Sequence, residues 1–444
     1  MASAAEQLAS NFSLKTFAKA EDLKKRLWFT LAALIVYRIG TYLPLPGVDA
    51  ELMRQIAQQN TSGILGIFDK FSGGALGRMT IFALSVMPYI SASIIVQLLT
   101  SVVPQLESLK KEGEAGKRKL NQYTRFGTVL LGTIQGWGIA VGLESMAGSP
   151  VIDPGFFFRF SAVVTLVGGT LFLMWLGEQI TSRGIGNGIS LLIFSGIVAG
   201  MPHAIAATLE LGRTQAFSAL FIFGVFILLI AAVAFIVYME RAQRRVFIQY
   251  PKRQVGARVY GGQSSHMPLK LNSAGVIPAI FASSLLLLPL TVANFGASQG
   301  EGVLSNLLLY LGPGKPLYML MYVALIMFFA FFYTAVVFNP IETAENLKKS
   351  GAIVPGYRPG KNTADHLDFI LTRLTVVGAL YLAVICALPE VLITRFSLPF
   401  YLGGTSLLIV VSVCIDTVSQ VQAHLLAHQY EGLIRRTKGK EGRS

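Results

Sequence analysis

The stretch of sequence from residue 217 to residue 239 reads FSALFIFGVFILLIAAVAFIVYM and contains no charged residue. An α-helix of about 20 apolar residues crosses the hydrocarbon core of a bilayer, so this stretch predicts a transmembrane helix. Lipid offers no hydrogen-bond partner to the backbone, and a spanning segment must therefore satisfy its N–H and C=O groups internally. A β-barrel would show alternating segments of about 10 residues, a pattern that this sequence lacks.

The rest of the chain fits the same class. Of the 444 residues, 53% are hydrophobic and 14% are charged, whereas soluble domains carry about 25% charged residues. Cys386 and Cys414 both fall in apolar runs, which indicates buried free thiols and no disulfide framework. Residues 1–26 precede the first run and no small-residue cleavage site follows it, so it is not a removed signal peptide. Ten spans are predicted: 27–43, 79–103, 126–143, 161–180, 184–201, 217–239, 274–293, 317–338, 374–388 and 402–425.

The basic residues indicate the orientation of these spans. Of the 37 Lys and Arg residues, 29 lie in the two termini and in the connections after the second, fourth, sixth and eighth spans. Cytoplasmic connections carry an excess of Lys and Arg, so both termini are predicted to be cytoplasmic. Spans one to five and six to ten then form two bundles of opposite orientation, which an inverted repeat would explain. The predicted divisions are a segment 1–26, halves 27–215 and 216–425, and a basic tail 426–444.

Three features do not fit a simple bundle. The stretch 61–78, TSGILGIFDKFSGGALGR, has apolar residues at helical spacing but is too short to cross a bilayer, so it is either a re-entrant helix or an interfacial one. Pro88 and Pro278 occupy equivalent places in the second and seventh spans and predict mid-helix kinks. The loops 240–270 and 339–368 are longer than helix connections require, which indicates folded projections that dock ribosomal RNA or an acidic protein.

No arrangement of residues indicates catalysis. His424 and His428 are four residues apart, but the carboxylate of a HExxH metal site is missing between them. The GxGxG string at 184–188 lacks the preceding strand that a nucleotide site requires. Asp416 is the one acidic residue well inside an apolar run, whereas a proton-coupled transporter normally carries several. A channel is therefore favoured over a secondary transporter of small solutes, and neither an enzyme nor a metal or cofactor site is predicted.

Six strings resemble the SecY/Sec61-alpha family, the channel subunits of protein translocons, and the match extends over nearly the whole chain. They are RIGTYLPLPG at 38–47, FALSVMPYISASI at 82–94, GEQITSRGIGNGIS at 177–190, NSAGVIPAI at 272–280, GYRPG at 356–360 and GGTSLLI at 403–409.

The resemblance implies an all-α membrane protein with ten helices in two inverted halves around a pore. An apolar ring would close this pore, and a plug helix within 61–78 would cover it. The ring would consist of Val86, Ile90, Ile189, Ile193, Ile280 and Ile409, and the plug would contain Ile64, Leu65, Ile67, Phe68 and Phe71. Val86 and Ile90 are spaced i, i+4, as are Ile189 and Ile193. This spacing independently places each pair on one helix face.

The resemblance also implies a lateral gate, loops that couple to partners, and a location. The gate would contain Ser91, Gln135 and Asn272, and the loops would bind partners through Arg244, Arg245, Lys252, Arg253 and Arg358. The implied partners are SecE, SecG, the SecA motor ATPase, the ribosome with its RNA, signal peptides, nascent chains, the lipid bilayer, SecDF and YidC. The implied location is the bacterial inner membrane, where the chain would pass unfolded polypeptides across the bilayer and helices into it.

Overall fold

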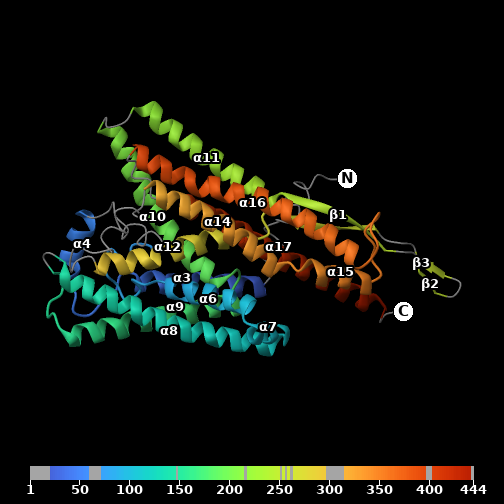
Figure 1. Ribbon diagram of the computed structural model, residues 1–444, viewed down its shortest axis with the longest axis horizontal. Helices are drawn as coiled ribbons and strands as arrows, with labels where there is room; N and C mark the ends of the chain where they lie inside the picture. Colours follow the sequence, from blue (N-terminus) through green and yellow to red (C-terminus); the bar gives the residue numbers. More distant parts are fainter. Residues whose placement is uncertain are drawn as a thin grey trace. The chain divides into compact units, whose positions relative to one another are not determined.

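The computed structural model describes residues 21–59, 72–146, 149–214, 218–250, 253–255, 258–260, 264–296, 315–396 and 403–441. Figure 1 shows that the described chain is built mainly of helices. The helices are α3 (Glu21–Gly40), α4 (Ala50–Gln59), α6 (Met87–Val102), α7 (Pro104–Lys111), α8 (Glu114–Ser145), α9 (Phe156–Arg183), α10 (Gly188–Arg213), α11 (Ala219–Arg241), α12 (Ile277–Gly296), α14 (Pro316–Val337), α15 (Pro340–Lys349), α16 (Lys361–Phe396) and α17 (Gly404–Glu441). The strands are β1 (Gln243–Gln249), β2 (Arg253–Val255), β3 (Arg258–Tyr260) and β4 (Ser264–Lys270).

Within the described residues, seven helices are long and apolar enough to cross a membrane, and an eighth span results if the bent pair α6 and α7 is counted as one. The bend between α6 and α7 is 99°. The remaining two predicted spans correspond to α3, which carries acidic residues in its first turn and Arg38 in its last, and to α12, whose stretch Ile277–Leu286 is a shorter apolar helix. The chain is thus a multi-pass helical membrane protein.

The predicted mid-helix kinks at Pro88 and Pro278 are wrong. Helix α6 begins at Met87 and α12 begins at Ile277, so each proline is the second residue of its helix. Proline fits the first helical turn because the N–H that it lacks would have no intrahelical acceptor there. The predicted second span, 79–103, is therefore helical only from Met87, and residues 73–86 form turns and a bridge.

Two compact units divide the chain. Unit 1 comprises 1–93, 121–202 and 409–444, and unit 2 comprises 94–120 and 203–408. These units are defined by packing and interleave along the chain, whereas the halves 27–215 and 216–425 are defined by sequence order and remain a prediction.

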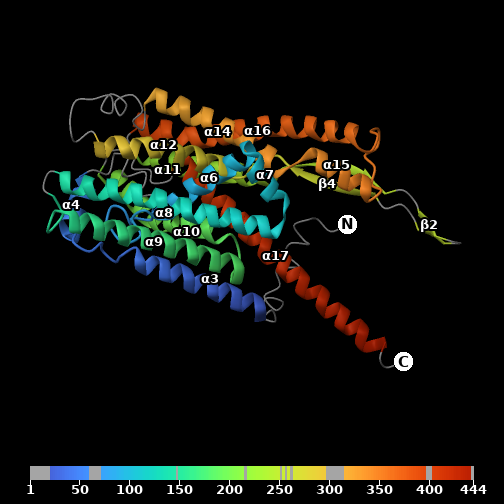
Figure 2. The ribbon, with the colours of Figure 1, turned by 60° about the horizontal axis from the view of Figure 1, so that its bottom comes forward.

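In unit 1, α8 and α9 lie side by side in both ribbon views (Figures 1 and 2). An ion pair joins them near each end. Arg125 Nη2 lies 2.6 Å from Glu178 Oε2, and Arg159 Nη2 lies 2.6 Å from Glu144 Oε2. The carboxylate of Glu144 also accepts the backbone N–H of Gly155 over 3.0 Å, so this pair holds the start of α9 as well.

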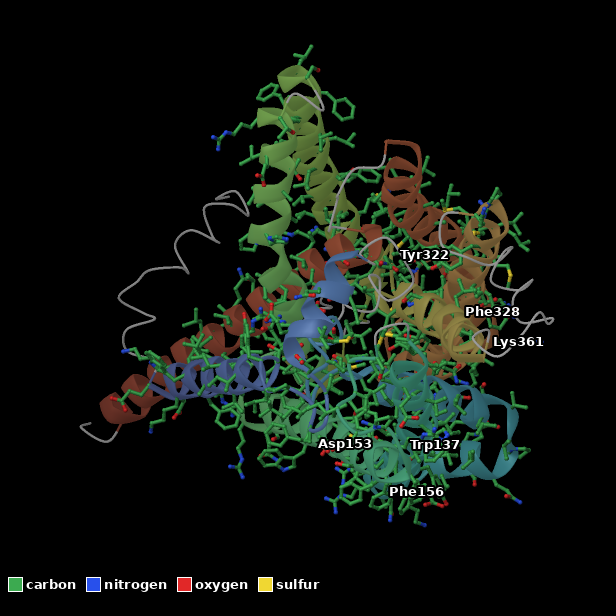
Figure 3. All side chains as sticks on the ribbon, turned by 90° about the vertical axis from the view of Figure 1, so that its left-hand side faces the viewer. Trp137, Asp153, Phe156, Tyr322, Phe328 and Lys361 are labelled. Carbon is green, nitrogen blue, oxygen red and sulfur yellow. The ribbon has the colours of Figure 1, made fainter. Side chains whose placement is uncertain are left out.

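Large apolar side chains are exposed on the outside of many helices. Trp137 on α8 and Phe156 at the start of α9 are 42% and 74% exposed, and Phe328 on α14 is 57% exposed (Figure 3). Exposed apolar patches of this extent mark an interaction surface, which for membrane helices is the lipid.

In unit 2, α12 packs against α14 and α14 packs against α16. The ring of Phe281 on α12 meets that of Phe329 on α14 edge to face, with centroids 5.7 Å apart. Such T-shaped pairs are favoured because the positive edge of one ring meets the negative face of the other.

The two long loops fold together into one structure, which we call the hairpin module. It consists of the antiparallel strands β1 and β4, residues 350–360 and the first turns of α16. Gln249 bridges to Ile353 and joins the first loop to the second. A small apolar core lies between them, made of Val246, Leu269, Val354, Leu367 and Leu371. The shorter hairpin β2–β3 projects beyond β1 and β4 in both ribbon views (Figures 1 and 2).

We expect Leu367→Ala to loosen the hairpin module. The Leu367 side chain is 0% exposed, and loss of a buried leucine typically costs about 2–5 kcal/mol of unfolding free energy. Limited trypsin digestion of membrane vesicles should then cut faster at Arg244 and Arg245 on β1. Val377→Ala, on the same helix at a side chain that is 48% exposed, serves as the control and should leave the cleavage rate unchanged. Equal rates for wild type and Leu367→Ala would contradict this core.

Candidate pore-lining site

Val86 and Ile90 stand at the start of α6 and belong to unit 1. Val86 precedes the first helical residue, and its carbonyl accepts the N–H of Ile90 over 3.1 Å. Both side chains are buried, at 1% and 7% exposure. This backbone hydrogen bond closes the first turn of the helix, so Val86 and Ile90 stand one turn apart as their i, i+4 spacing predicts.

The same local structure occurs in unit 2. Val276 precedes α12, and its carbonyl accepts the N–H of Ile280 over 3.2 Å. In both places the sequence is Val-x-Pro-x-Ile, and the proline is the second residue of the helix. Ile280 is half-buried. A repeated local sequence thus gives each unit a helix that starts one residue after a valine.

The approach to Val86 runs through buried, non-helical backbone. The N–H of Leu45 donates to Met79 O over 2.9 Å and the N–H of Ile81 donates to Leu43 O over 3.1 Å, so a short bridge fixes this stretch to the segment after α3. Met79 and Ser85 have φ angles of 45° and 51°. Residues other than glycine rarely adopt this left-handed backbone conformation. It costs about 1–3 kcal/mol and persists only where the surroundings enforce it.

Ile189 and Ile193 lie on the first turns of α10, also in unit 1. Ile193 is buried and Ile189 is half-buried. They follow the turn 184–188, in which three backbone N–H groups donate to side chains of other helices or of the preceding one. Ile185 N–H donates to Thr30 Oγ1 over 3.1 Å, Gly186 N–H to Gln420 Oε1 over 2.8 Å, and Gly188 N–H to Thr181 Oγ1 over 2.9 Å.

This turn is also packed very closely. A Cβ atom on Gly188 would lie 1.9 Å from the carbonyl oxygen of Gly177 on α9, a distance that no side chain tolerates. Ile185 packs into a small core with Leu23 and Leu425. The GxGxG string therefore forms a tight turn that fixes where α10 begins, and with it the positions of Ile189 and Ile193.

The last predicted ring residue, Ile409, lies near the start of α17 and is 1% exposed. The same helix carries Gln420, whose amide oxygen accepts the Gly186 N–H. One helix thus bears a candidate pore residue and also holds the turn that precedes two others. The sequence analysis missed Thr30 and Gln420, although polar residues within apolar spans were an available signal.

The three candidate gate residues have different surroundings. Ser91 on α6 is buried and Gln135 on α8 is half-buried. Asn272 is buried, and its Nδ2 donates to Glu240 Oε1 over 2.7 Å and to Gly275 O over 3.1 Å. The Asn272 amide therefore joins the end of α11 to the start of α12 within unit 2.

Of the candidate docking residues, Arg244, Arg245 and Arg358 are exposed. Arg244 and Arg245 are on β1, and Arg358 follows Tyr357, whose ring stacks on His366 with centroids 3.8 Å apart. The backbone places Arg253 on β2 and Arg258 on β3. Lys252 lies outside the described residues, as do the predicted plug residues Ile64, Leu65, Ile67, Phe68 and Phe71.

These features define a class: an all-α integral membrane protein in which buried apolar side chains follow non-helical, tightly tethered backbone. The SecY family model matches residues 80–418. The protein translocase subunit SecY of Rickettsia conorii is 56% identical over 436 residues, which cover 98% of this chain and 100% of that protein. The chain belongs to the SecY family.

Two solved structures share the fold. One is of a SecY protein whose plug domain is described as stabilising the closed translocation channel and maintaining a membrane seal. It has a TM-score of 0.61 and 18% identity over 90% of this chain and 92% of that one. The other is Sec61 in a canine ribosome–channel complex from the endoplasmic reticulum, with a TM-score of 0.57 and 17% identity over 90% and 92% of the two chains. The family assignment supports the ten-helix fold and the translocation channel over a small-solute transporter.

We expect Gln420→Leu to destabilise the chain by about 1–3 kcal/mol, because the buried N–H of Gly186 would lose its acceptor. The midpoint of thermal unfolding in detergent, followed by fluorescence size-exclusion chromatography, should fall. Gln422→Leu makes the same chemical change two residues further along α17, where no hydrogen bond to the turn exists, and should have a smaller effect. Equal midpoints for the two variants would show that the Gln420 contact contributes nothing.

Proposed function

We propose that this chain is the protein-conducting channel of a bacterial plasma membrane. It passes unfolded secretory polypeptides across the bilayer and releases membrane-protein helices sideways into it. Both termini lie in the cytoplasm, as the distribution of Lys and Arg indicates. The channel is passive and hydrolyses nothing, so the driving force comes from its partners.

The observation that carries this proposal is the burial of apolar side chains at the candidate ring positions. Val86, Ile90, Ile193 and Ile409 are 1–7% exposed, although each stands close to the start of its helix, where polar backbone groups are concentrated. A narrow apolar constriction excludes ions because it offers nothing to replace their hydration shell. It also offers a passing polypeptide no strong polar binding site, so that the polypeptide can leave again.

The ring is completed by Ile189 and Ile280, and the segment 61–78 serves as the plug. Ser91, Gln135 and Asn272 govern the lateral gate. The bonds of Asn272 to Glu240 and Gly275 hold the segment before α12 to the end of α11. They support a role in this gate, because an opening that moves α12 away from α11 would break them.

The partners act on the hairpin module. SecA and the ribosome, including its RNA, bind through Arg244, Arg245, Lys252, Arg253 and Arg358. The exposed guanidinium groups on β1 and at Arg358 support this assignment, since planar guanidinium forks bind carboxylates and phosphates well. SecE and SecG are the companion subunits in the membrane, and SecDF and YidC assist export and insertion.

The first experiment tests the ring. We expect Ile409→Asn to raise the ion conductance of the idle channel in planar bilayers, because a buried amide without partners costs about 1–3 kcal/mol and is relieved when water enters. Since about 1.4 kcal/mol is a factor of ten, leak openings should become roughly tenfold more frequent. Val418→Asn is the control, because Val418 on the same helix is 46% exposed. An unaltered seal in Ile409→Asn would refute the ring.

The second experiment tests the docking surface. Arg358→Glu should abolish SecA-driven export in vesicles while the protein still folds and inserts, since the Arg358 side chain is exposed. Lys361→Glu reverses an equally exposed charge three residues away (Figure 3) and should retain export. Normal export in Arg358→Glu, or an equal loss in both variants, would exclude a specific role for Arg358.

A further inference from the structure

Two arginines converge on the backbone turn at Gly73 and Gly74, all within unit 1. Arg38, in the last turn of α3, donates from Nη1 to Gly73 O over 2.9 Å. Arg78 donates from Nη2 to the same oxygen over 3.1 Å and from Nε to Gly74 O over 2.9 Å. The Gly73 carbonyl thus accepts from both guanidinium groups, and the Gly74 carbonyl accepts from Arg78 as well.

The ring of Tyr42 lies against both arginines. The guanidinium carbon of Arg78 is 4.2 Å from the centre of this ring and that of Arg38 is 5.2 Å from it. Arg38 Nη2 also donates to Tyr42 Oη over 3.3 Å. Cation–π contacts of this kind fix the planes of the guanidinium groups and hence the direction of their N–H donors.

The turn is pressed against α10. A Cβ atom on Gly73 would lie 2.7 Å from the Cα of Gly196, and the φ angle of Gly73 is +66°, so only glycine fits here. Gly196 is one helical turn beyond Ile193. On the side of α3, Tyr37 Oη donates to Ser72 O over 3.3 Å. The turn is therefore held between α3 and the part of α10 that carries Ile193.

From this turn the chain continues through the strained residues Met79 and Ser85 to Val86. Both strained residues are buried, and such a conformation persists only where the surrounding contacts enforce it. The bridge to Leu43 and Leu45 holds the stretch at Met79 and Ile81. Helix α6 holds one end, and the arginines hold the other.

We propose that Arg38 and Arg78 are positioning residues for the pore ring. They fix the stretch 72–86 in its strained conformation and thereby set Val86, and they hold this stretch against α10 at Gly196 and thereby set Ile193. This inference rests on the proposed function, because it gives these arginines a role in the closed state of the channel.

The test compares Arg78→Gln and Arg38→Gln with wild type in planar bilayers, and in vesicles with a secretory substrate whose signal peptide is weakened. Leak openings should become roughly tenfold more frequent, and export of the weakened substrate should rise. Arg78→Lys should leak as well, because a single ammonium group does not reproduce the fork that reaches both carbonyls. Arg213→Gln removes an exposed charge at the end of α10, far along the chain from the turn, and should seal normally.

A second variant separates positioning from general stability. Ser85→Gly places at φ +51° a residue that adopts this conformation without strain. If the arginines hold the strained stretch, Arg78→Gln combined with Ser85→Gly should seal better than Arg78→Gln alone, which a double-mutant cycle on leak frequency measures. A purely structural arginine would give additive effects, and additivity would overturn the inference.

The outcomes distinguish this inference from the proposed function. The positioning role is wrong if Arg38→Gln and Arg78→Gln seal like wild type, or leak no more than Arg213→Gln. If Ile409→Asn leaks in the same assay, the proposed channel function is still supported. If Ile409→Asn also seals, both proposals fail.

Discussion

The structure depends on satisfying the polar groups of buried, non-helical backbone. A buried N–H or C=O group without a partner costs free energy, so irregular backbone is stable inside a protein only where other groups bind it. In the turn 184–188, side chains of Thr30, Thr181 and Gln420 accept the N–H groups. At Gly73 and Gly74, the arginines bind the carbonyls instead. The first stretch leads directly into α10, and the second continues through residues 75–86 into α6. Both helices carry candidate ring residues.

This arrangement explains why the candidate ring residues stand near helix starts. Val86 and Val276 each accept the first helical bond from an isoleucine four residues later, and the proline between them needs no acceptor for an N–H. A helix start that is fixed by tertiary hydrogen bonds sets the position of the adjacent side chain more firmly than a free helix end, which frays. Accurate placement suits a seal, because an apolar ring excludes water only if it has no gap.

The hairpin module is held together by apolar side chains from both loops. Val246 and Leu269 from the first loop pack with Val354 and Leu367 from the second and with Leu371 on α16. The exposed basic residues of β1 and residue 358 therefore belong to one folded module.

The membrane class, the approximate spans, the family and the candidate ring residues could all be predicted from the amino-acid sequence. Long apolar runs admit only helices in lipid, and motif strings of nine or more residues leave little ambiguity. The three-dimensional structure was needed to show that the second span begins at Met87, that the prolines start helices, and that the two loops form one module. It also revealed the hydrogen bonds that Arg38, Arg78, Thr30 and Gln420 make to turn backbone. The bonds of Arg38, Thr30 and Gln420 and the joining of the two loops rest on contacts between residues far apart in the chain, and such contacts leave no periodic pattern in the sequence.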